Sequence, residues 1–205
     1  MIAILDYGSG NLRSAHRAFE LADSNTVVTR DPEVCRRADG LVVPGVGAFA
    51  ACMSQLIGAG GVEIIQDRVA SGKAIFGICV GMQVLFESSS EKGVTSGLCY
   101  LKGDVSEIKA PVLPHIGWNN VDAPVESKLF KGALGDSFYF VHSYGVQNWQ
   151  LEPHGSFKHP SVTWAEYGSK FVAAVENGPL SATQFHPEKS GEAGIKLLRN
   201  WLGSF

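Results

Sequence analysis

The sequence around Cys79 is of the kind that exposes a thiol so that it can act as a nucleophile. Residues 77–81 read Gly-Ile-Cys-Val-Gly, so a glycine lies two positions from the cysteine on each side. The apolar run 74–78 predicts a buried strand, and residues 81–86 after it have a helical pattern. This order is typical of a nucleophile elbow, a tight turn that lifts a side chain above the sheet at a helix N-terminus, where a thiolate is favoured. The alternative is a buried structural cysteine.

His186 and Glu188 offer the two other groups that a cysteine nucleophile needs. They are separated only by Pro187, which disfavours helical geometry at His186. In an extended segment residues i and i+2 point the same way, so Glu188 could hold one ring nitrogen while the other faces Cys79. A histidine beside a carboxylate in a solvated loop is the alternative. Together with the elbow, the pair favours acyl transfer.

Residues 44–47, Pro-Gly-Val-Gly, end another predicted strand and could supply backbone donors. Their amides could join that of Val80 around a developing oxyanion. Gly45, Gly47 and Ala50 also fit a dinucleotide-binding pattern, but they follow the third strand and lack the required acidic residue. Residues 8–10 after the first strand have Arg13 where a third glycine would stand, so we interpret them as a tight turn.

The elements around these residues predict an α/β fold. Short apolar runs at 2–5, 26–29, 41–43 and 74–78 alternate with helical patterns at 11–21, after 32 and up to about 71. That order predicts a mostly parallel central sheet with helices on both faces, of the flavodoxin-like kind. Strand patterns at 138–141, 162–165, 171–176 and 182–185 predict an antiparallel extension, and 192–202 predicts a closing amphipathic helix.

Composition narrows the functional classes. No linker interrupts the 205 residues, so we expect one domain over 1–205. The four cysteines show neither zinc-site nor disulfide spacing, which indicates reduced thiols and the cytoplasm. A net charge of −3 and a pI of about 6.1 argue against nucleic-acid binding. No signal-peptide pattern or apolar run of ~20 residues suggests export or a membrane span.

Three motifs carry a resemblance to a known family: PGVG at 44–47, GICVGMQ at 77–83 and FHPEKS at 185–190. Over nearly its whole length the chain resembles the class I, or triad, glutamine amidotransferases. The resemblance implies Cys79 as the nucleophile, His186 as the base and Glu188 as the orienting acid. It also implies that the amides of Gly47 and Val80 form the oxyanion hole, and that no metal or organic cofactor is needed.

The same resemblance implies where glutamine binds. Gln83 and Glu87 follow the elbow at a spacing of one helical turn, and the family places such residues near the substrate. His142, Ser143 and Tyr144 form a further family-like stretch, which we assign to substrate binding.

Four stretches narrow the resemblance within the class: DYGSGNL at 6–12, PHIGWN at 114–119, VHSY at 141–144 and Lys-Ser at 189–190. Together they resemble the glutaminase subunits of imidazole glycerol phosphate synthase, in histidine biosynthesis. This implies that ammonia passes to a partner cyclase subunit with a (β/α)₈ barrel. We expect Asn11, Trp118, Asn119 and Lys189 to face that partner. The alternatives are a stand-alone hydrolase, such as a γ-glutamyl peptidase, and a catalytically silent subunit.

Overall fold

The computed structural model describes residues 1–149 and 160–205 and is built on a seven-stranded sheet. In sheet order the strands are β11 (Ser161–Tyr167), β12 (Ser169–Asn177), β13 (Leu180–Thr183), β4 (Ala74–Cys79), β3 (Gly40–Gly45), β1 (Ile2–Leu5) and β2 (Thr26–Thr29). Strands β2, β1, β3, β4 and β13 run parallel, and β12 and β11 continue the sheet in antiparallel pairing. The fold class is therefore confirmed, but of the segments predicted for the antiparallel extension, 182–185 falls on the parallel strand β13 and 138–141 belongs to a separate two-stranded sheet.

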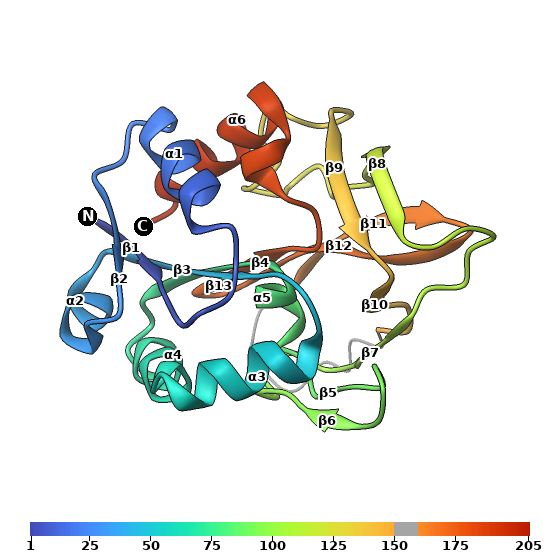
Figure 1. Cartoon of the computed structure of the whole chain (residues 1–205). Helices are drawn as coiled ribbons and strands as arrows, with labels where there is room; N and C mark the ends of the chain where they lie inside the picture. Colours follow the sequence, from blue (N-terminus) through green and yellow to red (C-terminus); the bar gives the residue numbers. More distant parts are fainter. Residues whose placement is uncertain (150–159) are drawn as a thin grey trace.

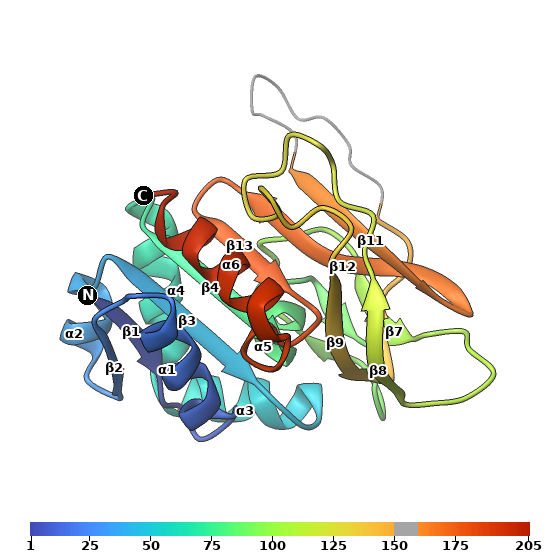
Figure 2. The ribbon, with the colours of Figure 1, turned by 90° about the horizontal axis from the view of Figure 1, so that it is seen from above.

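Helices cover both faces of this sheet, which is why β1, β3 and β4 are apolar and buried along their whole length. Figures 1 and 2 show α1 (Leu12–Leu21) and α6 (Gly191–Leu202) together on one face. The other face carries α2 (Pro32–Arg37), α3 (Phe49–Gly58) and α4 (Gly61–Ala70). Trp201 of α6 packs against Phe19 of α1 and Phe76 of β4, with ring centroids 5.7 and 5.2 Å apart, so the closing helix is fixed to the core.

Two helical predictions differ from the structure. The stretch expected to run to about residue 71 is two helices, α3 and α4, bent by 82° where Gly60 adopts a left-handed φ of 67°. The helix expected over 81–86 is the short α5 (Val80–Gln83), after which the chain turns. In the described residues no single helix is long and apolar enough to cross a membrane. The bent α3–α4 pair meets that test only by length and composition.

Two smaller sheets flank the carboxyl edge of the main sheet. One contains β10 (Tyr144–Val146), β7 (Asp104–Glu107), β5 (Ser88–Ser89) and β6 (Thr95–Ser96), and the other pairs β8 (His115–Asn120) with β9 (Ser137–His142). A 3₁₀ turn, η1 (Pro187–Lys189), joins β13 to α6. The junction of β9 and β10 thereby brings residues 141–144 to the end of β4.

The opposite, amino edge of the sheet holds both chain ends. The ammonium group of Met1 pairs with Asp39, and the ring of Phe205 packs on Trp201 beside the start of β3. Figure 1 shows the two ends near one another. Nearby, the buried side chain of Arg68 donates hydrogen bonds to main-chain carbonyls before β3 and in β4. This edge is stabilised by hydrogen bonds and lies away from Cys79.

Candidate active site

The turn at Cys79 has the geometry of an elbow. Cys79 ends β4 with a φ of 55°, a left-handed value that is unusual for a residue with a side chain. A Cβ at Gly81 would lie 1.8 Å from the carbonyl oxygen of Val43, and one at Gly77 would lie 2.6 Å from that of Gly81. Only glycine fits at these two positions, so the sequence pattern has a steric cause. The turn leaves Cys79 at the carboxyl end of β4, at the start of α5.

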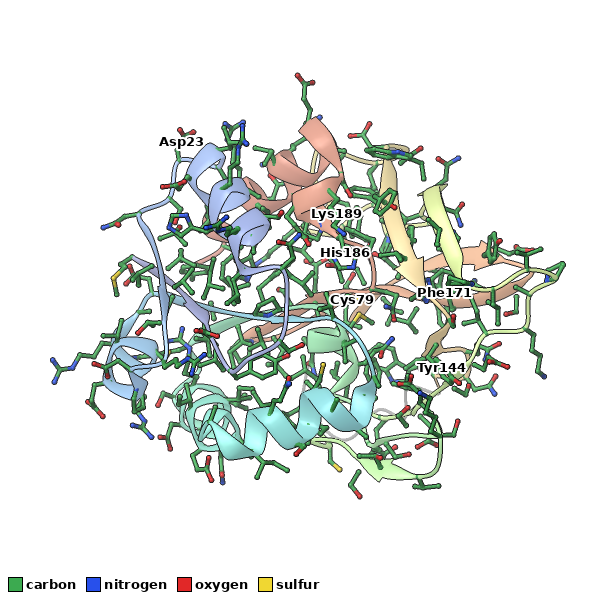
Figure 3. All side chains as sticks on the ribbon, in the orientation of Figure 1. Asp23, Cys79, Tyr144, Phe171, His186 and Lys189 are labelled. Carbon is green, nitrogen blue, oxygen red and sulfur yellow. The ribbon has the colours of Figure 1, made fainter. Side chains whose placement is uncertain are left out.

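His186 and Glu188 form the contact that their spacing predicts. The Nδ1 of His186 lies 2.7 Å from Oε1 of Glu188, and the two side chains are 2% and 3% exposed. Since a carboxylate can only accept, Nδ1 carries the hydrogen of this bond, and Nε2 is the ring nitrogen that remains available for proton transfer. Nε2 has no hydrogen bond with a nitrogen or oxygen in the described part of the chain, and Figure 3 shows the ring beside Cys79.

The charge state of His186 follows from its neighbours. Burial alone lowers its pKa, but hydrogen bonding and charge at Cys79 and Glu188 outweigh burial and raise the pKa to about 10. The ring is therefore an imidazolium at neutral pH. A positively charged ring therefore lies next to the sulfur of Cys79.

A cavity of about 310 Å³ opens above this group. Its volume is of the size that holds a small metabolite. Figure 3 shows Cys79, His186 and Lys189 near one another in the middle of the molecule, with Tyr144 to one side. Most of the residues predicted for the site line this cavity: Gly47, Cys79, Val80, Gln83, His142, Ser143, Tyr144, His186 and Lys189.

The loop after β3 directs a backbone donor away from the protein interior. The carbonyl of Val46 accepts hydrogen bonds from Ser9 Oγ at 3.0 Å and Cys52 Sγ at 3.3 Å. In a trans peptide the next N–H points the opposite way, so the amide of Gly47 is turned from Ser9 and Cys52. The amide of Val80 belongs to the first turn of α5, where no helical carbonyl is available to it. These two amides are suited to bind an oxyanion.

Glu91 is a cavity residue that the sequence did not reveal. Its carboxylate accepts from the backbone N–H of Phe49, at the start of α3, at 2.8 Å, and the residue lines the cavity. Glu87, which we expected there, is not among the described residues of the lining. It accepts from Lys102 Nζ and the amide of Gly103, both at 2.9 Å. Because α5 ends at Gln83, the chain turns before Glu87 can lie one turn beyond it.

The four residues expected to face a partner fall into two groups. Trp118 is 59% exposed and packs edge-on against Tyr139, and the ammonium group of Lys189 lies 5.8 Å from the same tyrosine ring. This row leads from the cavity to the surface. Asn119, on the other face of β8, donates to the carbonyl of Glu166, and Asn11 caps α1 by accepting from the amide of Ser14. The side chains of Asn119 and Asn11 are therefore hydrogen-bonded within this chain.

No metal site accompanies the cavity in the part of the chain that the structure describes. Among residues 1–149 and 160–205, no group of three or more His, Cys, Asp and Glu side chains is arranged to hold an ion.

Comparisons with known proteins decide the family. The model of the class-I glutamine amidotransferases matches residues 3–204. A Nocardia farcinica protein named imidazole glycerol phosphate synthase subunit HisH is 58% identical over 99% of this chain and 97% of its own length. This chain belongs to the HisH family of class-I glutamine amidotransferases. HisH proteins of Leifsonia xyli and Thermobifida fusca are 57% and 55% identical, each over 99% of this chain and 98% of their own.

Solved structures show the same fold. A crystal structure of a glutamine amidotransferase superposes with a TM-score of 0.76 at 19% identity, covering 98% of the HisH-family chain and 97% of its own. A putative GMP synthase protein from Thermoplasma acidophilum gives 0.70 at 22% identity, covering 98% and 92%. The predicted resemblance is thus confirmed, and the HisH-family chain is a glutamine-hydrolysing enzyme.

Proposed function

We propose that Cys79, His186 and Glu188 release ammonia from glutamine, and that the chain supplies this ammonia to a partner cyclase subunit for imidazole ring formation in histidine biosynthesis. The observation that carries the proposal is the His186 ring, held by Glu188 at 2.7 Å and charged beside the sulfur of an elbow cysteine. Membership of the HisH family supports the same reaction.

The reaction follows from the positions of these groups. The Cys79 sulfur attacks the side-chain amide carbon of glutamine, and the amides of Gly47 and Val80 bind the resulting oxyanion. His186 transfers its Nε2 proton to the departing nitrogen, which leaves as ammonia, and a thioester remains on Cys79. A water then loses a proton to His186, attacks the thioester carbon and releases glutamate. Glu188 holds the ring in one orientation throughout.

The cavity lining supports binding of an amino acid. Glu91 supplies a carboxylate of the right sign for the α-ammonium group of glutamine, and Gln83 lies on the wall next to the elbow. His142, Ser143 and Tyr144 close the side formed by β9 and β10. We assign these residues to glutamine binding.

An exposed apolar strip supports the partner proposal. Ile116 and Trp118 are both 59% exposed and lie two positions apart on the same outward face of β8. Trp118 packs on Tyr139, and the ring of Tyr139 lies beside Lys189 at the cavity. The relatives are named as subunits of a synthase. A cyclase of the (β/α)₈ type, as the family resemblance implies, would cover this strip and receive ammonia beside Lys189.

Two further properties belong to the proposal. We assign residues 1–205 to a single domain, because one hydrophobic core joins β1 at the start of the chain to α6 at its end. The cysteines Cys35, Cys52, Cys79 and Cys99 are free thiols, which supports a reducing compartment such as the cytoplasm.

A reconstitution with the cyclase tests the division of labour. In Cys79→Ser, glutamine-dependent ring formation should fall by at least ~10³-fold, whereas ammonium salts should still support synthesis, because the acceptor site lies on the cyclase. This ammonium rescue should grow with pH, since only neutral ammonia is nucleophilic. Glutamate and the imidazole product are measured together for wild type and variant. Loss of the ammonium-dependent reaction would contradict the separation of the two sites.

The same assay distinguishes a free-standing hydrolase. Glutamate release by the wild-type chain alone should be slow and should rise when the cyclase and its ligand are added. Full-speed hydrolysis of glutamine or γ-glutamyl peptides without a partner would replace the proposed function with that of a peptidase. A glutamine-analogue electrophile should label Cys79 and spare the exposed Cys99.

A further inference from the structure

A main-chain carbonyl fixes the orientation of a side-chain amide near the nucleophile. The carbonyl oxygen of Tyr144 can only accept, and it lies 2.9 Å from the amide end of Gln83, so Gln83 must present its NH₂ group there. The same NH₂ group lies 2.9 Å from the amide of Gln184, which must therefore present its oxygen. Two hydrogens and two acceptors account fully for this nitrogen.

The orientation of Gln184 then determines what faces Cys79. Because its oxygen is turned to Gln83, its Nε2 is the atom that lies 3.7 Å from the sulfur of Cys79, within reach of an N–H···S hydrogen bond. Gln184 is 1% exposed, and its backbone N–H is bound to the carbonyl of Ala173 on the neighbouring strand. A buried donor with so little freedom is aimed at the reacting atom.

The Tyr144 carbonyl is itself held from a second side. His142 donates to it through Nδ1 at 2.9 Å, which leaves His142 Nε2 as an acceptor for the Nδ1–H of His115 at 3.2 Å. The side chain of Asn119 lies 3.5 Å from the remaining nitrogen of His115. All these groups are neutral partners with one consistent direction of donation. The carbonyl that sets the amide chain is therefore in a fixed position.

We infer that Gln184 is a positioning residue for the nucleophile: its amide N–H, turned toward Cys79 by Gln83 and the Tyr144 carbonyl, orients the sulfur and stabilises the thiolate. The inference rests on the proposed function and adds a donor to it. Gln184 is not among the described residues that line the cavity. Its effect should therefore fall on the reactivity of the sulfur and not on glutamine binding.

Alkylation of the full-length chain by iodoacetamide, followed at Cys79 by peptide mapping across pH, measures this reactivity directly. Gln184→Met keeps the length of the side chain and removes the donor. Its alkylation midpoint should rise by about one pH unit, and kcat for glutamine in the cyclase complex should fall about tenfold with little change in KM. Gln184→Glu, which places acceptor oxygens beside the sulfur, should shift the midpoint further in the same direction.

Other variants separate this effect from altered folding. Gln147 makes a similar set of amide hydrogen bonds, to Ser106 and to the carbonyl of Glu107, outside the cavity lining. Gln147→Met should leave the midpoint unchanged. If Gln184→Met does not fold, Gln83→Met frees the Gln184 amide to rotate and should give a smaller rise. The titratable groups that interact with Cys79 or line its cavity keep their side chains in every variant: His186, Glu188, Tyr7, Cys52, Glu91, His142, Tyr144 and Lys189.

The outcome is decided by alkylation alone, which needs no glutamine. A midpoint equal to wild type in Gln184→Met and Gln184→Glu, or in Gln83→Met where they do not fold, would overturn the role of Gln184, as would an equal shift in Gln147→Met. Failure of the proposed function looks different. In that case the wild-type chain with its cyclase would not turn over glutamine, whatever the midpoints show.

Discussion

In the proposed mechanism, Glu188 acts only through its contact with the ring of His186. Its Oε1 accepts from Nδ1, while Oε2 is buried without a hydrogen bond in the described structure. Removing the charge but keeping the shape in Glu188→Gln should lower kcat on the order of 10²-fold, because an amide oxygen can still hold the ring but stabilises an imidazolium less. His186→Ala should lower kcat by about 10⁴-fold.

Steady-state kinetics of both variants in the cyclase complex, with thermal unfolding as the control for folding, check this order. The loss in Glu188→Gln should appear mainly in kcat, since Glu188 is not among the described residues of the cavity lining. Activity equal to wild type would show that Glu188 plays no part in orienting the ring.

His115 and His142 make stability depend on pH. Burial lowers the pKa of each to about 4, whereas an unfolded histidine titrates near 6.5. Between these pH values the unfolded chain binds more protons than the folded chain. The free energy of unfolding should therefore rise with pH through this window and decrease as pH falls through it. Each histidine contributes a slope of up to about 1.4 kcal/mol per pH unit.

His115→Phe keeps the ring that stacks on Tyr167 at 4.0 Å and removes one titrating group. Denaturant unfolding at several pH values should show a shallower slope between pH 4 and 6.5 than in wild type, and parallel curves above pH 7. An unchanged slope in the lower window would contradict the buried, neutral state of His115.

At the scale of elements, the turn between β4 and α5 leaves no room for a side chain at Gly81. A methyl group at Gly81 would meet the Val43 carbonyl of β3 at 1.8 Å, and backbone cannot move aside cheaply. Gly81→Ala should therefore lower the free energy of unfolding by about 3 kcal/mol or more. Gly58, in the last turn of α3, has open space at the same position, so Gly58→Ala should be neutral or stabilising by up to ~1 kcal/mol.

Chemical denaturation of the two glycine variants beside wild type measures this difference. Equal stability of Gly81→Ala and wild type would mean that the two strand ends can separate, and the steric account of the elbow would be wrong.

The parts of the molecule that the sequence predicts are those governed by local rules. Apolar runs predicted the buried strands, and the spacing of His186 and Glu188 predicted a contact that the structure contains. The roles of these residues in catalysis stay predictions. The prediction of a helix over 81–86 was wrong because Leu85 and Phe86 are apolar in order to pack in the core, and their spacing happens to match a helical pattern.

Other residues act through contacts that no local pattern records. Arg68 resembles an ordinary helix-surface charge in the sequence, yet it is 1% exposed and binds carbonyls about thirty positions earlier in the chain, such as that of Ala38. Glu91 reaches the cavity because the loop after β5 turns back to the start of α3, and Gln184 meets Cys79 across a difference of 105 positions. Such contacts depend on how the strands pair, so they became visible only in the folded chain.

At the scale of the whole molecule, Trp118 lies on the exposed apolar strip that we propose the cyclase covers. Trp118→Ala should weaken binding of the cyclase by about 2 kcal/mol, or roughly 30-fold in Kd, because large aromatic side chains dominate interfaces. Glutamate release by the isolated chain should change little. Trp118→Phe keeps a ring and should restore most of the affinity.

Titration of the labelled chain with cyclase gives these affinities. Ile57 on α3 is exposed to a similar extent, 61% against 59%, and Ile57→Ala provides a control for loss of exposed apolar surface. Equal affinity of Trp118→Ala and wild type for the cyclase would show that the partner binds to another face of the molecule.

Both chain ends lie at the amino edge of the sheet, which decides where tags or other proteins can be attached to the chain. An affinity tag, a fluorophore or a further protein attached near Met1 or Phe205 would leave from the edge opposite Cys79. Because the two ends lie near one another, a short flexible peptide could also connect them, and new ends could be opened elsewhere in the chain. The fold thus offers a point of attachment that leaves the cavity beside Cys79 clear.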